Sequence, residues 1–553
     1  MHMADANPDT ALPVTRRVVW CEFLALARLA GPIVLMYLTS IGVAFTSQVL
    51  VGHVSSTHLA AAALATMFSN ATGLSVVLGC AASCDTLCSQ AFGAKNYPRV
   101  GLVAYRGVFV GLVMSIFVGA LWVFGAGPFF RAMDQDEELI SLATAYIRTL
   151  LWGLPAQVSF ELLKKPFLSA NFTLQPLLFS ALSMALTGFL GYLFVYVFEN
   201  GYLGAPAAAC VSYWLCLALL LLYTRFHRRT HRALAAARAL CCCGRAPPAP
   251  TPAPAGAAAA DDGGIGLAEW GVPPWGGSSR AAEAPGAALL PAGAPPPPLP
   301  PAPPPPASPP AFHDLLDALW PPLTLEVLSP AGLLEYVRIG LPSAAMLFVE
   351  WGSYEVLAVF AGMLGQLELA SHSILAITAS IGFMPFLGFS VACCIRVGQA
   401  LGELRPHAAV LSYHTALLCA LGVFCANGAL MMAARSTWGG VFTPDPAVGG
   451  VVADTLYLVA LYGLFDGLQC VCTGAMRGGA MQTAAAGINV FSYIAVGLPL
   501  AYALALKARW GLTGIWLAFN MAVLTSTLLA AVALWRTNWG KKAAEAREKA
   551  LRE

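Results

Sequence analysis

The sequence predicts an all-α, polytopic membrane protein with twelve transmembrane helices arranged as two parallel six-helix bundles. Three observations support this fold class: the apolar composition, the spacing of charge-free segments and an internal repeat. Of the 553 residues, 58% are hydrophobic and only 10% are charged, and the mean hydropathy is +0.70. A soluble domain typically carries about 25% charged residues. This chain therefore has too few charges to cover a surface that faces water.

Composition also argues against several classes of protein. The formal net charge of +2 gives no indication of nucleic-acid binding. The 15 cysteines show no CxxC…CxxC pattern, so neither a zinc site nor a disulfide framework is indicated. No Walker A, GxSxG or HExxH motif occurs in a suitable context. We therefore expect no enzyme activity, no bound metal and no cofactor.

Charge-free segments long enough to cross a bilayer recur along the chain. A membrane-spanning helix needs about 20 predominantly apolar residues. In lipid each backbone must satisfy its own hydrogen bonds, so these segments are expected to be helices. The predicted spans are 29–52, 59–84, 102–126, 139–160, 174–197, 203–224, 339–361, 369–394, 409–434, 451–473, 481–506 and 511–535.

Lysine and arginine predict the orientation. Placing the N-terminus in the cytoplasm puts most of the Lys and Arg in inner loops, including Lys164 and Lys165. The outer loops then hold few basic residues and the acidic run Asp134, Asp136, Glu137 and Glu138. The bias predicts that both termini are cytoplasmic.

An internal repeat relates the two groups of spans. Arg28 and Pro32 recur as Arg338 and Pro342, in each case 310 positions later. The same offset of 310 recurs between Gly153 and Gly463. Because each half holds an even number of spans, the halves run parallel about an axis along the membrane normal. Two repeats that rock around a midplane site are a recurrent design of secondary transporters.

The repeat and the composition predict the domain boundaries. A long segment between the halves is rich in Pro, Ala and Gly, and is expected to be a disordered cytoplasmic linker. The cysteines from Cys241 to Cys243 are either S-palmitoylated or unmodified cytosolic thiols. The predicted parts are a cytoplasmic tail (1–27), a six-helix bundle (28–226), the linker (227–335), a second six-helix bundle (336–537) and a cytoplasmic tail (538–553).

Acidic residues inside spans are the strongest candidates for function. Glu350, Glu355 and Asp466 lie within predicted spans seven and ten. A charged residue at a helix centre costs roughly 2.5–3.5 kcal/mol, so such residues usually face the bundle interior. Burial favours the neutral acid, which makes proton binding and release feasible. In the repeat their counterparts are uncharged, namely Ser40, Phe45 and Ala156. We therefore expect an asymmetric site in the second half.

Neighbouring residues complete the predicted substrate and proton site. Tyr354 shares a helix face with Glu350, whereas Glu355 lies about 140° round the helix. Trp351 and Tyr354 either offer cation–π contacts or pack in the core. His372 is either a proton relay or a hydrogen-bonded core histidine. The acids themselves can alternatively be protonated, buried structural groups.

Two ionic contacts are expected near the inner helix ends. Glu161 and Lys165 are four residues apart, which predicts an ordinary ion pair on one helix face. Asp85 is expected either to cap the following turn or to pair with a basic residue.

Several segments resemble the multidrug and toxic compound extrusion (MATE) family. The sequence CDTLCSQAFGA at 84–94 is similar to the loop after the family's second helix. MPFLGFSVA at 384–392 and RVGQALG at 396–402 are similar to the matching segment in its second half. GAMRG at 474–478 and GLP at 497–499 fit the region of the eleventh helix. The resemblance covers both halves and leaves out the linker.

The resemblance implies a MATE-like fold and antiport of small organic solutes against protons, with sodium a less expected coupling ion. Glu350 and Glu355 are similar to the seventh-helix acids of the eukaryotic branch, and Asp466 falls where that branch has an acid in the tenth helix. Ile377 and the pair Ser169-Ala170 depart from the animal-type pattern.

We expect a monomer in the lipid bilayer of a plasma or vacuolar membrane that exports organic cations, secondary metabolites or xenobiotics. An organic-anion exporter of the same fold and a lipid flippase or scramblase remain as alternatives.

Overall fold

The computed structural model describes residues 16–133, 135–242, 319–320, 322, 324–443 and 445–552. At Ser56 and over 227–242 it describes the backbone alone. Two compact units are present, one formed by Met1–His227 with Asp317–Glu553 and the other by Arg228–Leu316. Most of the predicted disordered linker (227–335) and the side chains of Cys241–Cys243 lie outside the described residues. The two ends of the predicted linker are described and are helical instead of disordered, because one helix spans Gly204–Cys242 and two others, Leu325–Leu328 and Pro330–Leu364, begin before residue 336. All contacts below belong to the first unit.

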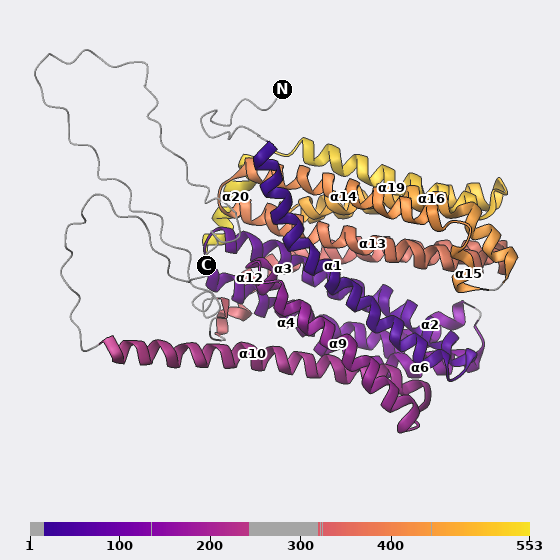
Figure 1. The fold of residues 1–553 in the computed structure, drawn as a ribbon, viewed down its shortest axis with the longest axis horizontal. Helices are drawn as coiled ribbons and strands as arrows, with labels where there is room; N and C mark the ends of the chain where they lie inside the picture. The colour runs from indigo at the N-terminus through magenta and orange to yellow at the C-terminus, as the bar shows by residue number, and fades with distance from the viewer. Residues whose placement is uncertain are drawn as a thin grey trace, which may run out of the picture. The chain divides into compact units, whose positions relative to one another are not determined.

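The first half of the chain is helical throughout its described length (Figure 1). Short π-helical segments join or continue several of its helices. Its elements are α1 (Arg16–Gly52), α2 (Ser56–Ser69), η2 (Asn70–Leu74), α3 (Ser75–Gly93), α4 (Tyr97–Ala120), η3 (Leu121–Gly125), α5 (Ala126–Ala132), α6 (Glu137–Leu151), α7 (Leu154–Leu163), α8 (Lys165–Ser169), α9 (Leu174–Tyr192), η4 (Leu193–Val197), η5 (Gly201–Leu203) and α10 (Gly204–Cys242).

The second half repeats this plan and adds a short helix at its end. The elements are η7 (Leu325–Leu328), α12 (Pro330–Leu364), α13 (Gln366–Gly402), α14 (Pro406–Ala434), α15 (Trp438–Phe442), α16 (Pro446–Gly478), α17 (Gln482–Asn489), η8 (Val490–Gly497), α18 (Leu498–Ala501), η9 (Tyr502–Lys507), α19 (Gly511–Trp535) and α20 (Trp539–Leu551).

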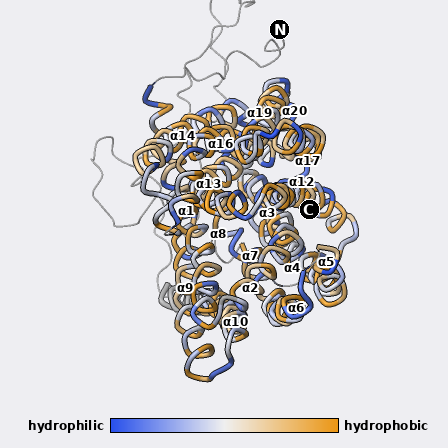
Figure 2. The backbone as a smooth tube through the Cα atoms, turned by 90° about the vertical axis from the view of Figure 1, so that its right-hand side faces the viewer, coloured by the Kyte–Doolittle hydropathy of each residue, from blue (hydrophilic) through white to orange (hydrophobic). Residues whose placement is uncertain are grey.

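The helices confirm the predicted fold class. Among the described residues, 11 helices are long and apolar enough to cross a membrane, and a bent pair brings the number to 12. Figure 2 shows apolar residues along most of their length. The bent pair, Glu137–Leu151 with Leu154–Ser169, turns by 47°. Pro155 stands in the first turn after this break, where a missing backbone N–H is tolerated.

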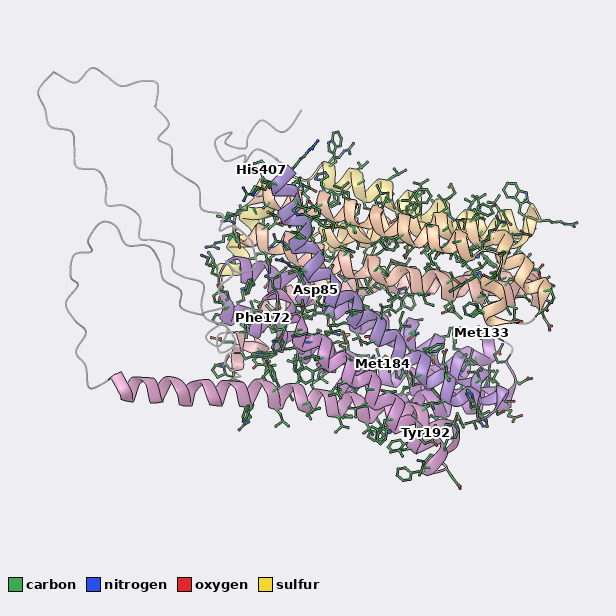
Figure 3. All side chains as sticks on the ribbon, in the orientation of Figure 1. Asp85, Met133, Phe172, Met184, Tyr192 and His407 are labelled. Carbon is green, nitrogen blue, oxygen red and sulfur yellow. The ribbon has the colours of Figure 1, made fainter. Side chains whose placement is uncertain are left out.

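The two halves approach each other closely where α3 passes α13. We call the end of the unit that holds α20, Gly93 and Gly402 the α20 end, and the opposite end, with Met133 and α15, the far end (Figures 1 and 3). A Cβ atom on Gly93 would lie 2.1 Å from the Gln399 carbonyl oxygen, and one on Gly402 would lie 2.2 Å from that of Gln90. The repeat has an offset of 309 here, since Gln90 and Gly93 recur as Gln399 and Gly402. These reciprocal contacts therefore join equivalent positions, as a pseudo-twofold axis requires.

Polar contacts between the halves gather at the α20 end. Arg396 of α13 pairs with Glu22 of α1 at 2.6 Å, and Arg99 of α4 pairs with Glu335 of α12 at 2.9 Å. On the neighbouring face of α3, the Thr86 hydroxyl donates to the Arg477 carbonyl at 2.8 Å. These bonds connect the two halves.

Helix α20 adds a further link across the α20 end. Its first turn is capped by the Asn538 side chain, and its buried face consists of alanines. Asn96 of the first half donates to the Ala550 carbonyl at 2.9 Å. Arg547 donates to the Gly402 carbonyl of the second half at 3.0 Å. The segment that was expected to be a C-terminal tail therefore contains a packed helix that touches both halves.

Candidate functional site

Glu350 and Asp466 lie together inside the second half. Glu350 projects from α12 and Asp466 from α16, with exposed fractions of 7% and 2%. Tyr354 and Tyr462, each one helical turn from one of the acids, are hydrogen-bonded to each other, so both acids face the region between α12 and α16. In the part of the chain that the structure describes, neither acid forms an ion pair with Lys or Arg. Two such acids in a low-dielectric interior strongly disfavour double ionisation.

A chain of hydrogen bonds fixes Glu350. The Asn489 amide donates from Nδ2 to Glu350 Oε2 at 3.1 Å. The Oδ1 atom of Asn489 accepts from Gln469 Nε2 at 3.2 Å and from the Ser526 hydroxyl at 3.0 Å. Since both donors occupy the amide oxygen, the amide nitrogen must face Glu350. Asn489 ends α17 where the chain passes into the π-helical segment η8, a feature that is frequent at functional sites.

Asp466 keeps one carboxyl oxygen without a partner. Among the described residues no hydrogen bond reaches its Oδ1 atom. Asp466 and Tyr462 also line a narrow pocket between α13, α14 and α16, with a volume of about 10 Å³. That volume is close to the smallest that holds one water molecule. The lining residues of the opposite walls include Phe386, Asn427 and Met431. Asp466 therefore lines a pocket and has a carboxyl oxygen that accepts no hydrogen bond from the described residues.

Two tyrosines connect the helices that carry the acids. The hydroxyls of Tyr354 on α12 and Tyr462 on α16 are hydrogen-bonded to each other. The Tyr462 ring stacks on Phe519 with centroids 5.4 Å apart, and the Tyr354 ring meets Phe519 edge-on at 4.6 Å. Tyr493 packs on the same Phe519 ring at 5.6 Å. The acids thus sit beside an aromatic cluster built on α19.

The other predicted site residues lie apart from this group. Glu355 and Trp351 are half-buried, and the described residues offer Glu355 no hydrogen bond or ion pair. His372 is buried, with its ring 5.7 Å from Trp516 and its Nδ1 atom unpartnered among the described residues. The structure therefore brings together Glu350, Asp466 and Tyr354, and leaves Glu355, Trp351 and His372 outside their hydrogen-bonded surroundings.

Sequence analysis missed four residues of this group, namely Tyr462, Gln469, Asn489 and Ser526. A signal for them was present, because Gln469 and Asn489 are amides inside otherwise apolar spans and an unpaired amide in lipid is costly. The predicted site includes uncharged neighbours of Glu350 but none of Asp466, and it therefore leaves out these side chains. Asn489 also lies 139 positions after Glu350, a separation for which helix periodicity gives no guidance.

The buried charges of the first half are paired, and here one expectation was wrong. Lys165 pairs with Asp85 at 2.8 Å, with both side chains buried. Glu161 pairs with Lys164 at 2.6 Å instead of with Lys165. The reason is that α7 ends and α8 begins at Lys164 and Lys165, which turns Lys165 toward α3. Figure 3 shows Asp85 in the interior of the unit. Asp85 therefore has the basic partner that was one of its two predicted roles.

The chemistry of the group in the second half is that of a proton or cation site. Two buried carboxyls that form no ion pair can bind either a proton or a positively charged ligand, and one can replace the other. The aromatic faces beside them can contact a cation. Within the described residues, no group of three His, Cys, Asp or Glu is placed to hold a metal ion.

Comparison with known proteins links this geometry to a family. The model of the MatE family matches residues 32–193 and again 342–503, so the two matches are offset by 310 positions, like the internal repeat. Multidrug and toxin extrusion protein 1 of Danio rerio is 26% identical over 535 residues, which cover 97% of this chain and 75% of the relative. An uncharacterized transporter of Schizosaccharomyces pombe is 28% identical over 530 residues, 94% of this chain and 80% of the relative.

Solved structures share the fold. The crystal structure of the eukaryotic MATE transporter AtDTX14 matches with a TM-score of 0.77 and 24% identity, and covers 96% of this chain and 100% of that one. A MATE protein in the bent conformation matches with a TM-score of 0.69 and 16% identity, over 97% and 99% of the two chains.

Proposed function

Because this chain belongs to the MatE family, whose members are transporters and not enzymes, we propose that it exports small organic cations in exchange for protons. The single observation that carries the proposal is the pair of membrane-embedded acids, Glu350 and Asp466, without a basic partner among the described residues. Keeping two charged carboxylates inside the membrane has a large free-energy cost. A proton or a bound cation offsets the negative charge of the carboxylates and so reduces their desolvation penalty. The proton and the cation compete, because only one of them can occupy the site at a time.

Competition for these carboxyls supplies the exchange. With the site deprotonated, the Asn489 amide donates to Glu350 and the free oxygen of Asp466 accepts a cation, while the Tyr354 ring contributes its face. Protonation neutralises the acids and removes most of the attraction for the cation. The cation binds more weakly to the protonated site than to the deprotonated site, and this difference in affinity shifts the equilibrium toward release.

The contacts between the halves supply the gate. With both termini in the cytoplasm, as the Lys and Arg bias indicates, the α20 end faces the cytoplasm. The ion pairs Glu22–Arg396 and Arg99–Glu335 then hold the cytoplasmic side closed. Opening toward the cytoplasm requires these bonds to break while each half moves as a unit around the midplane site. We place the protein in a plasma or vacuolar membrane.

The test is transport by the purified full-length protein in proteoliposomes with an imposed pH gradient and labelled tetraethylammonium as the probe. We expect gradient-driven uptake by the wild type, and a loss of at least about 100-fold in Glu350→Gln and in Asp466→Asn. Glu355→Gln is the matched control, because it changes the same chemical group on the same helix outside the hydrogen-bonded group.

Other outcomes separate the alternatives. Uptake of an organic anion, but not of tetraethylammonium, would favour an anion exporter of the same fold. Movement of a labelled phospholipid without dependence on the pH gradient would favour a flippase or scramblase. Full activity of both acid variants would show that the carboxyls are structural, and the proposed exchange site would then be wrong.

A further inference from the structure

A symmetric pattern joins the two acids of the site. Tyr354 follows Glu350 by four residues on α12, and Tyr462 precedes Asp466 by four residues on α16. Side chains four residues apart lie on one face of a helix. Each acid therefore has a tyrosine one turn away, and the hydroxyls of the two tyrosines are hydrogen-bonded to each other. The resulting order across the helices is Glu350, Tyr354, Tyr462, Asp466.

We propose that the hydroxyl pair of Tyr354 and Tyr462 relays a proton between Asp466 and Glu350, which makes both tyrosines participants in proton coupling. This inference rests on the function proposed above. It identifies how a proton that enters at one acid reaches the other while organic cation occupies or leaves the space between them.

The surroundings hold the pair in place. Tyr462 is 2% exposed and its ring stacks on Phe519 with an interplanar angle of 8°. The Tyr354 ring meets the same Phe519 ring at 78°. Two rings packed on a common neighbour lose most of their rotational freedom, which pre-organises the contact between their hydroxyls.

Each end of the relay has an acid one helical turn away. Asp466 and Tyr462 both line the pocket that has room for about one water molecule. At the other end, Glu350 lies one turn before Tyr354 on the same face of α12. The titratable groups that face the pair are Glu350 on α12, Asp466 on α16 and Tyr493 on η8.

One passage of the relay moves a single proton. The protonated Asp466 carboxyl gives its proton to the Tyr462 oxygen, directly or through the water. Tyr462 passes its own hydroxyl proton to the Tyr354 oxygen, and Tyr354 passes its proton to the Glu350 carboxylate. Each tyrosine ends with one proton, Asp466 is left as a carboxylate, and Glu350 becomes neutral. Rotation of the two hydroxyls resets the chain.

The repeat supplies an independent argument. At the offset of 310, the counterparts of Tyr354 and Tyr462 in the first half are Ala44 and Trp152. Trp152 is 78% exposed and its position carries no hydroxyl. The shared fold therefore does not require tyrosine at either position. The tyrosine pair and the two acids lie in the same half, the second one.

Phenylalanine variants isolate the hydroxyls. Tyr354→Phe and Tyr462→Phe keep the aromatic faces and their packing but break the chain of hydroxyls. Tyr493→Phe is the matched control, because Tyr493 is also buried on Phe519 but its hydroxyl has no partner among the described residues. Two transport modes are measured in proteoliposomes with tetraethylammonium: uptake driven by a pH gradient, and exchange of labelled for unlabelled cation without a gradient.

We expect each single variant to lose at least about tenfold in gradient-driven uptake, because a proton-transfer group has been removed. Cation exchange without a gradient should stay within about twofold, because the rings remain. The double variant should be no slower than the slower single variant, as expected for two links of one chain. Tyr493→Phe should resemble the wild type in both modes.

Two results would overturn the relay. Gradient-driven uptake that stays at the wild-type level in both variants would show that the hydroxyls carry no proton. An equal loss in both transport modes would show that the tyrosines serve folding or alternation instead. Absence of gradient-driven uptake in the wild type would contradict the proposed function itself, so failure of the relay and failure of antiport are distinguished by the wild type.

Discussion

The two halves of this protein share a fold and treat buried charge in opposite ways. In the first half Asp85 is buried and paired with Lys165 at 2.8 Å. In the second half Glu350 and Asp466 are also buried, but among the described residues neither forms an ion pair, and Glu350 is held by the amide of Asn489. The repeat replaces these acids by Ser40 and Ala156 in the first half. The repeated fold thus holds a buried ion pair in one half and, in the other, the acids that we propose to change charge.

The ion pair and the unpaired acids differ in the interactions that replace their lost hydration. A buried ion pair recovers part of its lost hydration through its partner, and removal of one partner exposes the other to the full penalty. An unpaired acid avoids the penalty by binding a proton. Under the proposed exchange, the paired charge of the first half stays constant, whereas the charge of Glu350 and Asp466 depends on what is bound.

The largest effect on stability is expected in the first half. Asp85→Asn leaves Lys165 buried without its partner, which should lower the free energy of unfolding by about 3–5 kcal/mol. Asp466→Asn, which we expect to abolish exchange, should leave stability unchanged or increase it. Thermal unfolding of the detergent-solubilised proteins measures both. The double variant Asp85→Asn/Lys165→Met should recover most of the loss, and equal melting temperatures for Asp85→Asn and Asp466→Asn would contradict the comparison.

Introducing an acid into the first half tests whether an acid alone is enough to form an exchange site. Ala156 is the buried counterpart of Asp466, and Ala156→Asp should cost roughly 2.5–3.5 kcal/mol of stability. We expect no recovery of gradient-driven uptake when this change is made in the Asp466→Asn background. The counterparts of Asn489 and Tyr462 are Phe179 and Trp152, so the new acid has no amide or hydroxyl to hold it. Ala156→Asn is the control for volume, and restored uptake would contradict this expectation.

The amide that holds Glu350 should have an intermediate effect. Asn489→Ala removes the donor to Glu350 and leaves the Gln469 amide and the Ser526 hydroxyl without their acceptor. The cost should be about 1–3 kcal/mol in stability, with a loss of about tenfold in gradient-driven uptake. Unfolding and transport are measured on the same preparation. Asn427→Ala, which removes an amide from the opposite wall of the pocket, serves as control.

Glu355 should show the smallest effect of the predicted site residues. It is half-buried, and no described residue bonds to it, so Glu355→Gln should change uptake by no more than about twofold and stability by less than about 1 kcal/mol. The same transport assay with graded pH gradients measures this. A loss as large as that of Glu350→Gln would move Glu355 into the exchange site and widen the difference between the halves.

Local composition was enough to predict most of the architecture. The number of spans, their assignment to helices and the parallel relation of the halves follow from apolar length and from the offset of 310, because lipid admits few other structures. The bend at Pro155 and the packed helix α20 were not predicted, since the first depends on a short break within an apolar run and the second on alanines that pack against both halves.

The sequence by itself determined the fold class, the repeat, the family resemblance and the presence of acids where a membrane makes acids costly. Only the tertiary structure decided which of them share an environment. It turned Lys165 toward Asp85 in preference to Glu161, brought Asn489 to Glu350 from 139 positions away, and placed the hydroxyls of Tyr354 and Tyr462 in contact. The physical reason is that helix periodicity specifies which face a side chain occupies, whereas its neighbour across that face depends on how helices distant in the chain pack.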